Sequence, residues 1–113
     1  MGGDKIIVEY SYAEFIPILK AISDETRLKI IDMLSCEEMC ANDILDEFKI
    51  SQSTLSYHMK ILSDAGIVIA VREGAWMRYN LNKDKAEGLI NFIEYITSEK
   101  DDCICRNVKR GDK

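Results

Sequence analysis

The sequence predicts a mainly α-helical domain that carries one β-hairpin, and three patterns along its 113 residues indicate this fold class. Residues 41–48 and 51–66 each repeat apolar side chains at the three- and four-residue spacing of an amphipathic helix, and only two residues separate them. Residues 67–81 form two β-prone runs on either side of Glu73-Gly74, which indicates a hairpin. Two short helices joined by a tight turn and followed by a hairpin predict a winged helix-turn-helix, which is α+β.

Length and composition indicate one globular domain. A chain of 113 residues is too short for two full cores, and its composition, 47% hydrophobic and 31% charged, is ordinary for a folded protein. We expect a flexible arm at residues 1–10, the domain at residues 11–100 and a cysteine-containing tail at residues 101–113. No apolar run approaches the roughly 18 residues of a membrane span, and no secretory signal is recognisable. We therefore expect a cytoplasmic protein with no membrane partner.

Two helices are expected before the helix-turn-helix. Ser11 and Glu14 have the spacing of a capping box, and Pro17 predicts that the first helix either begins near it or kinks there. The apolar stripe of this helix comprises Phe15, Ile18, Leu19 and Ile22. A second helix should follow, with Ser23 or Asp24 as its N-cap. Its inward positions are expected to be Leu28, Ile31 and Leu34.

The helix expected at residues 51–66 has one apolar and one polar face. Its apolar stripe comprises Leu55, Met59 and Leu62, extended by Ala65, and Gly66 is expected as the C-cap. The N-cap position and the opposite face carry side chains that donate or accept hydrogen bonds, as contact with base edges and phosphates in a major groove requires. These candidate DNA-binding residues are Ser51, Gln52, Ser53, Thr54, Ser56, Tyr57, His58 and Lys60.

The expected hairpin alternates between two faces. The positions that should pack on the helices are Met77, Tyr79 and Leu81. Arg72 and Arg78 are expected to contact phosphate or the minor groove, although a hairpin face that meets only solvent would have the same pattern. Trp76 is expected to pack at the base of the hairpin.

A long, strongly apolar helix is expected after the hairpin, capped by Asn82 or Asp84 and ending near Glu99. Its apolar stripe comprises Ala86, Leu89, Ile90, Ile93 and Ile96, with Phe92 and Tyr95 beside it. The helix could complete the core of its own chain, but so apolar a face in so small a domain favours a homodimer that forms through the terminal helices. A two-fold dimer would place two recognition helices about 34 Å apart, one turn of DNA.

The net charge of −5 is unevenly distributed. Residues 49–82 hold four basic and two acidic side chains, a net charge of +2, so the rest of the chain carries −7. A mildly basic face on an acidic body suits a DNA-binding protein of modest non-specific affinity. Charge alone is equally compatible with an acidic protein that binds no nucleic acid.

Four cysteines form two close pairs, Cys36 with Cys40 and Cys103 with Cys105. Each pair can chelate an ion, the first if its segment is helical, and a helix beginning at Ala41 would place Cys40 at its N-cap. All-sulfur ligation favours soft, thiophilic ions such as arsenite, antimonite, cadmium and lead. A structural zinc site is disfavoured because neither pair has the Cys-x-x-Cys spacing. Any one cysteine could instead be a small buried apolar residue.

From Phe15 to Glu99 the chain resembles the ArsR/SmtB family of metal- and metalloid-responsive repressors. The segments that carry the resemblance are residues 23–28 (SDETRL), 50–62 (ISQSTLSYHMKIL), 65–68 (AGIV), 72–76 (REGAW) and 79–81 (YNL). The resemblance implies a homodimer that represses a resistance operon and leaves a palindromic operator when an inducer binds its thiolates. Many arsenic and cadmium sensors of the family have a Cys-Val-Cys at the start of the first helix of the helix-turn-helix. Here Cys40 matches the first cysteine and Asn42 stands at the second, and the terminal helix lacks the histidines of the family's zinc site.

We therefore expect Cys36 and Cys40 to join one or both of Cys103 and Cys105 in binding arsenite, antimonite or a soft divalent ion. The alternative is a repressor of the same fold that senses oxidants or reactive sulfur through a disulfide or persulfide. An enzyme is not expected, because no nucleophile–base pair or phosphate loop is present and His58 is the only histidine.

Overall fold

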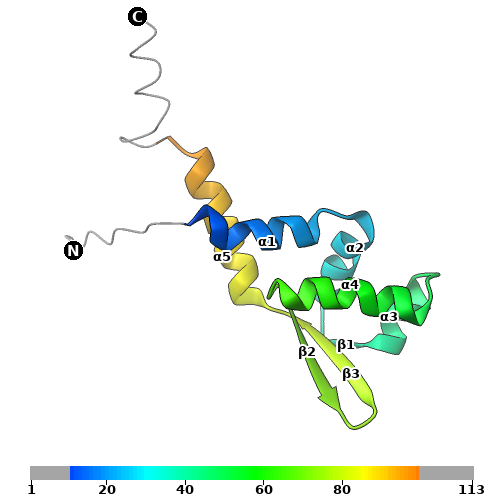
Figure 1. Ribbon diagram of the computed structural model, residues 1–113. Coiled ribbons are helices and arrows are strands. Elements are labelled where there is room, and N and C mark those ends of the chain that lie inside the picture. Colours follow the sequence, from blue (N-terminus) through cyan, green and yellow to red (C-terminus); the bar gives the residue numbers. More distant parts are fainter. Residues whose placement is uncertain (1–10, 100–113) are drawn as a thin grey trace, which may run out of the picture.

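The computed structural model describes residues 11–99, which form a helical body with a projecting hairpin (Figure 1). The arm at residues 1–10 and the tail at residues 100–113, with Cys103 and Cys105, lie outside the described residues. The elements are α1 (Tyr12–Ile22), α2 (Glu25–Leu34), β1 (Met39–Cys40), α3 (Ala41–Glu47), α4 (Gln52–Asp64), β2 (Val68–Glu73), β3 (Trp76–Leu81) and α5 (Lys83–Thr97). Within this range no helix is long and apolar enough to cross a membrane.

One apolar core joins the helices to the base of the hairpin. Its most buried side chains come from every helix and from both long strands, and they include Phe15, Ile18, Ile30, Leu34, Ile44, Leu55, Met59, Leu62, Val68, Tyr79 and Phe92. The rings of Phe15 and Phe92 stack with centroids 4.4 Å apart, which fixes α5 against α1. Burial raises the pKa of Tyr79, the aromatic residue that β3 contributes to this core.

Helix α1 differs from the expectation at its start. It begins at Tyr12 and continues through Pro17, so of the two alternatives the start near Pro17 is wrong. The predicted capping box is also wrong, because the Ser11 side chain makes no cap hydrogen bond. Pro17 removes one backbone hydrogen bond from the helix. The burial of Phe15 and Ile18 on either side of it offsets that loss by holding the helix on the core.

Helix α2 is capped as expected but is rotated from the predicted orientation. The Asp24 side chain accepts a hydrogen bond from the Arg27 amide at 3.0 Å, so Asp24 is the N-cap. Ile30 is completely buried and Leu28 is 51% exposed, so the predicted inward position of Leu28 is wrong. Ile30 and Leu34 share one face of the helix, whereas Leu28 lies about 200° around the axis from Ile30. The packing of α2 on its neighbours determines that Ile30, and not Leu28, is buried.

The sheet contains one strand more than the hairpin. Its order is β1-β3-β2, and both pairings are antiparallel. Strand β1 lies between α2 and α3, where no strand was expected, and it pairs Met39 with Tyr79 and Cys40 with Arg78. A two-residue strand has too little period-two pattern to be recognised from sequence. Cys40, the second cysteine of the first pair, is thereby joined directly to the hairpin.

Candidate nucleic-acid interface and thiol segment

Helix α4 has the predicted ends and the predicted buried face. Ser51 Oγ accepts a hydrogen bond from the Thr54 amide at 3.1 Å and caps the first turn. At the other end Gly66 has a φ of +84°, and hydrogen bonds from Gly66 N to Ser63 O (3.0 Å) and from Ile67 N to Leu62 O (3.2 Å) close a Schellman motif. Glycine adopts this left-handed conformation without steric cost. The chain therefore leaves α4 and enters β2 at a defined angle.

The opposite face of α4 presents most of the predicted polar side chains. Those that are exposed are Gln52, Ser53, Ser56, Tyr57 and Lys60, whereas Thr54 and His58 are half-buried. Lys60 Nζ forms an ion pair with Asp64 Oδ2 at 3.1 Å, one turn further along the same helix. The exposed side chains of α4 form a surface of hydrogen-bonding groups.

His58 differs from the other candidates because its ring is engaged by another helix. Its Nδ1 lies 3.0 Å from Nη1 of Arg27 on α2. The guanidinium can only donate hydrogen bonds, so His58 Nδ1 is the acceptor in this contact. Sequence spacing could not reveal this contact, since 31 positions separate the two residues.

The hairpin carries Arg72 and Arg78 as expected, and their surroundings differ. Arg72 is exposed on β2. Arg78 Nε donates to Glu73 Oε1 at 2.8 Å, and its Nη1 lies 4.0 Å from Glu38 Oε1. Trp76 is 55% exposed and stands next to the hairpin turn, so the prediction that it packs at the base is wrong.

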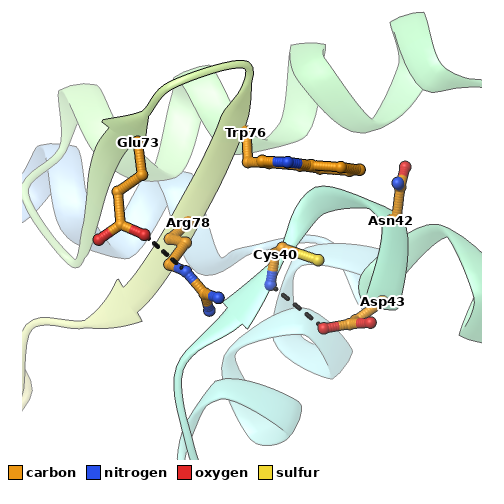
Figure 2. Close-up of a pocket in the computed structure, with 6 residues that line it drawn as sticks. All are labelled: Cys40, Asn42, Asp43, Glu73, Trp76 and Arg78. Carbon is orange, nitrogen blue, oxygen red and sulfur yellow. Dashed lines mark hydrogen bonds and ion pairs between the residues drawn. The ribbon is translucent and has the colours of Figure 1, made fainter.

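Cys40 occupies the N-cap of α3, as predicted, and its amide donates to Asp43 Oδ2 at 3.4 Å. Figure 2 shows Cys40 between Arg78 on one side and Asn42 and Asp43 on the other, with the indole of Trp76 extending across. These side chains and Glu73 line a hollow of about 350 Å³ between α3 and the hairpin. The Cys40 thiol is half-buried beside this hollow.

Cys36 lies in the turn after α2 and is exposed. The segment from Cys36 to Cys40 is not helical, so the condition under which the two thiols would share one helical face is not met. Within residues 11–99, no three histidine, cysteine or acidic side chains form a group that could hold a metal ion. Cys103 and Cys105 lie outside that range.

Sequence reasoning missed the contacts of Glu38, which join the segment from Cys36 to Cys40 to the hairpin. Asn80 Nδ2 donates to Glu38 Oε2 at 3.2 Å, and the other carboxylate oxygen of Glu38 faces Arg78. The two cysteines thus flank a residue that binds two side chains of β3. An acidic pair between two cysteines, Glu37-Glu38, was the only signal available in the sequence.

Comparison with known proteins agrees with this architecture. The sequence model of the family described as "Bacterial regulatory protein, arsR family" matches residues 24–70. The arsenical resistance operon repressor of Staphylococcus aureus is 44% identical over 102 residues, which cover 90% of this chain and 98% of that protein. An ArsR-like transcriptional regulator from Rhodococcus has a TM-score of 0.68 at 27% identity, covering 75% of this chain and 80% of that one.

A second solved structure has the same fold at lower identity. It is the homodimeric winged helix-turn-helix DNA-binding domain of a possible ArsR-family regulator from Mycobacterium bovis, with a TM-score of 0.63 at 22% identity over 80% of this chain and 89% of that one. The predicted fold class is thereby confirmed. The family and its members are DNA-binding regulators and not enzymes. The chain belongs to the ArsR family of winged helix-turn-helix transcription regulators.

Proposed function

We propose that this protein is a cytoplasmic, homodimeric repressor of a metalloid-resistance operon. It binds a palindromic operator and leaves it when arsenite, antimonite or a soft divalent ion such as cadmium or lead binds cysteine thiolates. The observation that carries the proposal is the pairing of Cys40 on β1 with Arg78 on β3, which joins a thiol directly to the hairpin. The 44% identity to an arsenical resistance operon repressor supports the choice of inducer.

The described contacts supply a route from the thiols to the DNA-facing surface. Capture of one ion by both Cys36 and Cys40 would draw their sulfur atoms together, and the non-helical segment between them would have to rearrange. Glu38 lies in that segment and binds Asn80 and Arg78, so the rearrangement would pull on β3. Near-complete switching between two states requires about 5.5 kcal/mol of differential affinity, which several metal–thiolate bonds can supply.

The tail completes the site in this proposal. Cys36 and Cys40 offer two thiols, and no third histidine, cysteine or acidic side chain joins them within residues 11–99. A trivalent arsenical forms up to three bonds to sulfur, so we assign the remaining ligand to Cys103 or Cys105, from the same chain or from the partner subunit. The cysteine pair outside the described residues is then a functional part of the sensor.

Operator release tests the proposal. A fluorescent duplex from the promoter of its own gene is bound by the fully reduced protein and titrated with arsenite, and anisotropy reports release. Wild type should be released, whereas Cys40→Ser should bind the duplex with unchanged affinity and stay bound. Asn42→Ser is the matched control, because it alters the same hollow without removing a thiol and should be released like wild type. Full release of Cys40→Ser would remove this cysteine from the mechanism.

The single tryptophan allows ligand binding to be measured separately from release. Trp76 is the only tryptophan of the chain and lines the same hollow as Cys40, so arsenite binding should change its fluorescence. The change should be absent in Cys40→Ser. If arsenite leaves the emission of wild type unchanged while operator release still occurs, the ion binds away from Cys40.

The homodimer is supported by apolar side chains that the single chain leaves exposed. On α5 the exposed fractions are 63% for Ile90 and 40% for Ile96, and on α1 they are 62% for Tyr12 and 42% for Ile16. The Mycobacterium bovis domain with the same fold is described as homodimeric. Ile90→Glu should therefore yield monomers in analytical ultracentrifugation. Val71→Glu, an exposed apolar residue on β2, is the control and should stay dimeric. A monomeric wild type would refute this part of the proposal.

A further inference from the structure

We propose that Arg27 and His58 are positioning residues for DNA recognition: together they hold the recognition helix α4 at the angle it needs, and His58 is not itself a base-reading residue. The inference rests on the DNA binding of the proposed function and does not depend on the inducer. It starts from the hydrogen bond between Arg27 Nη1 and His58 Nδ1, 3.0 Å long and partly buried, which joins α2 to α4.

Arg27 contacts three helices from one position. Its guanidinium donates through Nε to the carbonyl oxygen of Ala21 at the end of α1 and through Nη1 to His58 on α4. Its backbone amide donates to the Asp24 carboxylate, which caps α2, and this hydrogen bond lowers the pKa of Asp24. The planar guanidinium holds its donors in a fixed geometry, so these contacts set the relative orientation of the three helices.

His58 lies at the middle of α4, between the exposed polar side chains and the buried stripe. Its neighbours along the helix differ from it in exposure, since Tyr57 is 61% exposed and Met59 is 2% exposed. The half-buried ring of His58 faces α2, and its edge meets the ring of Tyr57 with centroids 5.3 Å apart. Loss of the Arg27 contact would therefore free α4 to shift and would also disturb an exposed aromatic ring on the DNA-facing side.

The energetic scale makes the effect measurable. A hydrogen bond to a charged group contributes more than one between neutral groups, and part of that contribution would be lost from the DNA-bound geometry if α4 were less well fixed. We expect a loss of roughly tenfold in operator affinity, which corresponds to about 1.4 kcal/mol.

The experiment compares variants on a duplex that the wild-type protein selects from random sequences, without inducer. His58→Leu removes the acceptor, and His58→Asn places an amide oxygen near the position of Nδ1. Arg27→Met removes the donor, and Lys29→Met is the matched control, since it removes an exposed positive charge from the same helix. Circular dichroism establishes that each variant is folded at the temperature of the binding measurement.

We expect His58→Leu and Arg27→Met each to bind roughly tenfold more weakly, and the double variant to bind no more weakly than either. His58→Asn and Lys29→Met should stay within about threefold of wild type. The slope of log affinity against log salt should be the same for His58→Leu and wild type, because no phosphate contact is lost.

Three results would overturn the inference. One is wild-type affinity in His58→Leu. Another is a loss in His58→Asn as large as in His58→Leu, which would mean that the ring itself contacts DNA. The third is a salt slope smaller by about 0.9 in His58→Leu, which would identify a phosphate contact. Failure of the wild-type protein to select any duplex would instead refute the proposed function, and this inference with it.

Discussion

Ser51→Ala should destabilise the protein because Ser51 caps the recognition helix. Ser51 Oγ accepts a hydrogen bond from the Thr54 amide at 3.1 Å and lies 2.9 Å from Thr54 Oγ1. Loss of such an N-cap costs about 1 kcal/mol. For a domain of this size a loss of that magnitude lowers the melting temperature by about 4 °C or slightly more. The first turn of α4 carries candidate DNA contacts, so operator affinity should fall as well.

The chain supplies a matched control for this prediction. Ser11 occupies the N-cap of α1, but its side chain makes no cap hydrogen bond. Ser11→Ala should therefore change the free energy of unfolding by less than about 0.5 kcal/mol. Urea unfolding, followed by circular dichroism at one protein concentration, measures both variants. Equal losses in Ser11→Ala and Ser51→Ala would refute the assignment of stability to the capping hydrogen bond. Ser51→Thr keeps the acceptor and should retain most of the stability.

Three further predictions concern charge, pH and the core. Glu73→Gln removes the partner whose carboxylate lies 2.8 Å from Arg78 Nε. Since both side chains are exposed, the free energy of unfolding should change by less than about 1 kcal/mol. The slope of log operator affinity against log salt concentration should steepen by about 0.9 if Arg78 then reaches a phosphate. An unchanged slope in anisotropy titrations would exclude that contact. The Arg27 amide lowers the pKa of Asp24 below its usual value of about 3.9, so the charged cap stabilises the fold above that pH and its contribution disappears as the pH falls through the lowered pKa. In urea titrations Asp24→Asn should thus be less stable than wild type at neutral pH, and the gap should close in acid; a gap independent of pH would contradict the charge effect. Ile44 is completely buried, and Ile44→Ala should cost about 2–5 kcal/mol in the same assay, far more than a surface substitution.

Much of the fold could be predicted because its signals are local. The burial of Leu55 and Met59, the capping of α4 by Ser51 and the left-handed Gly66 follow from residues within one or two helical turns of one another. Leu28 shows the limit of this reasoning. It is apolar and sits at a helical spacing that suits burial, yet it is 51% exposed because α2 turns Ile30 to the core.

The candidate site was only partly predictable for a related reason. The cysteines, the polar face of α4 and the arginines of the hairpin could be named from residue type and spacing. The partners of His58 and Arg78 could not be named, because each is brought in by another element. Arg78 is held by Glu73 and faces Glu38, and Trp76 lies at the exposed end of the hairpin.

The amino-acid sequence by itself determined the five helices and the hairpin, and for α4 also the caps and the apolar face, since these depend on spacings of two to four residues along one chain segment. Tertiary structure alone decided the contacts that join distant segments. Arg27 meets His58 across 31 positions, and Glu38 meets Asn80 across 42. Such contacts depend on the rotation of each helix about its axis and on the register of a two-residue strand. The packing of the whole core sets both, because a buried side chain fits only where every neighbouring element leaves it room.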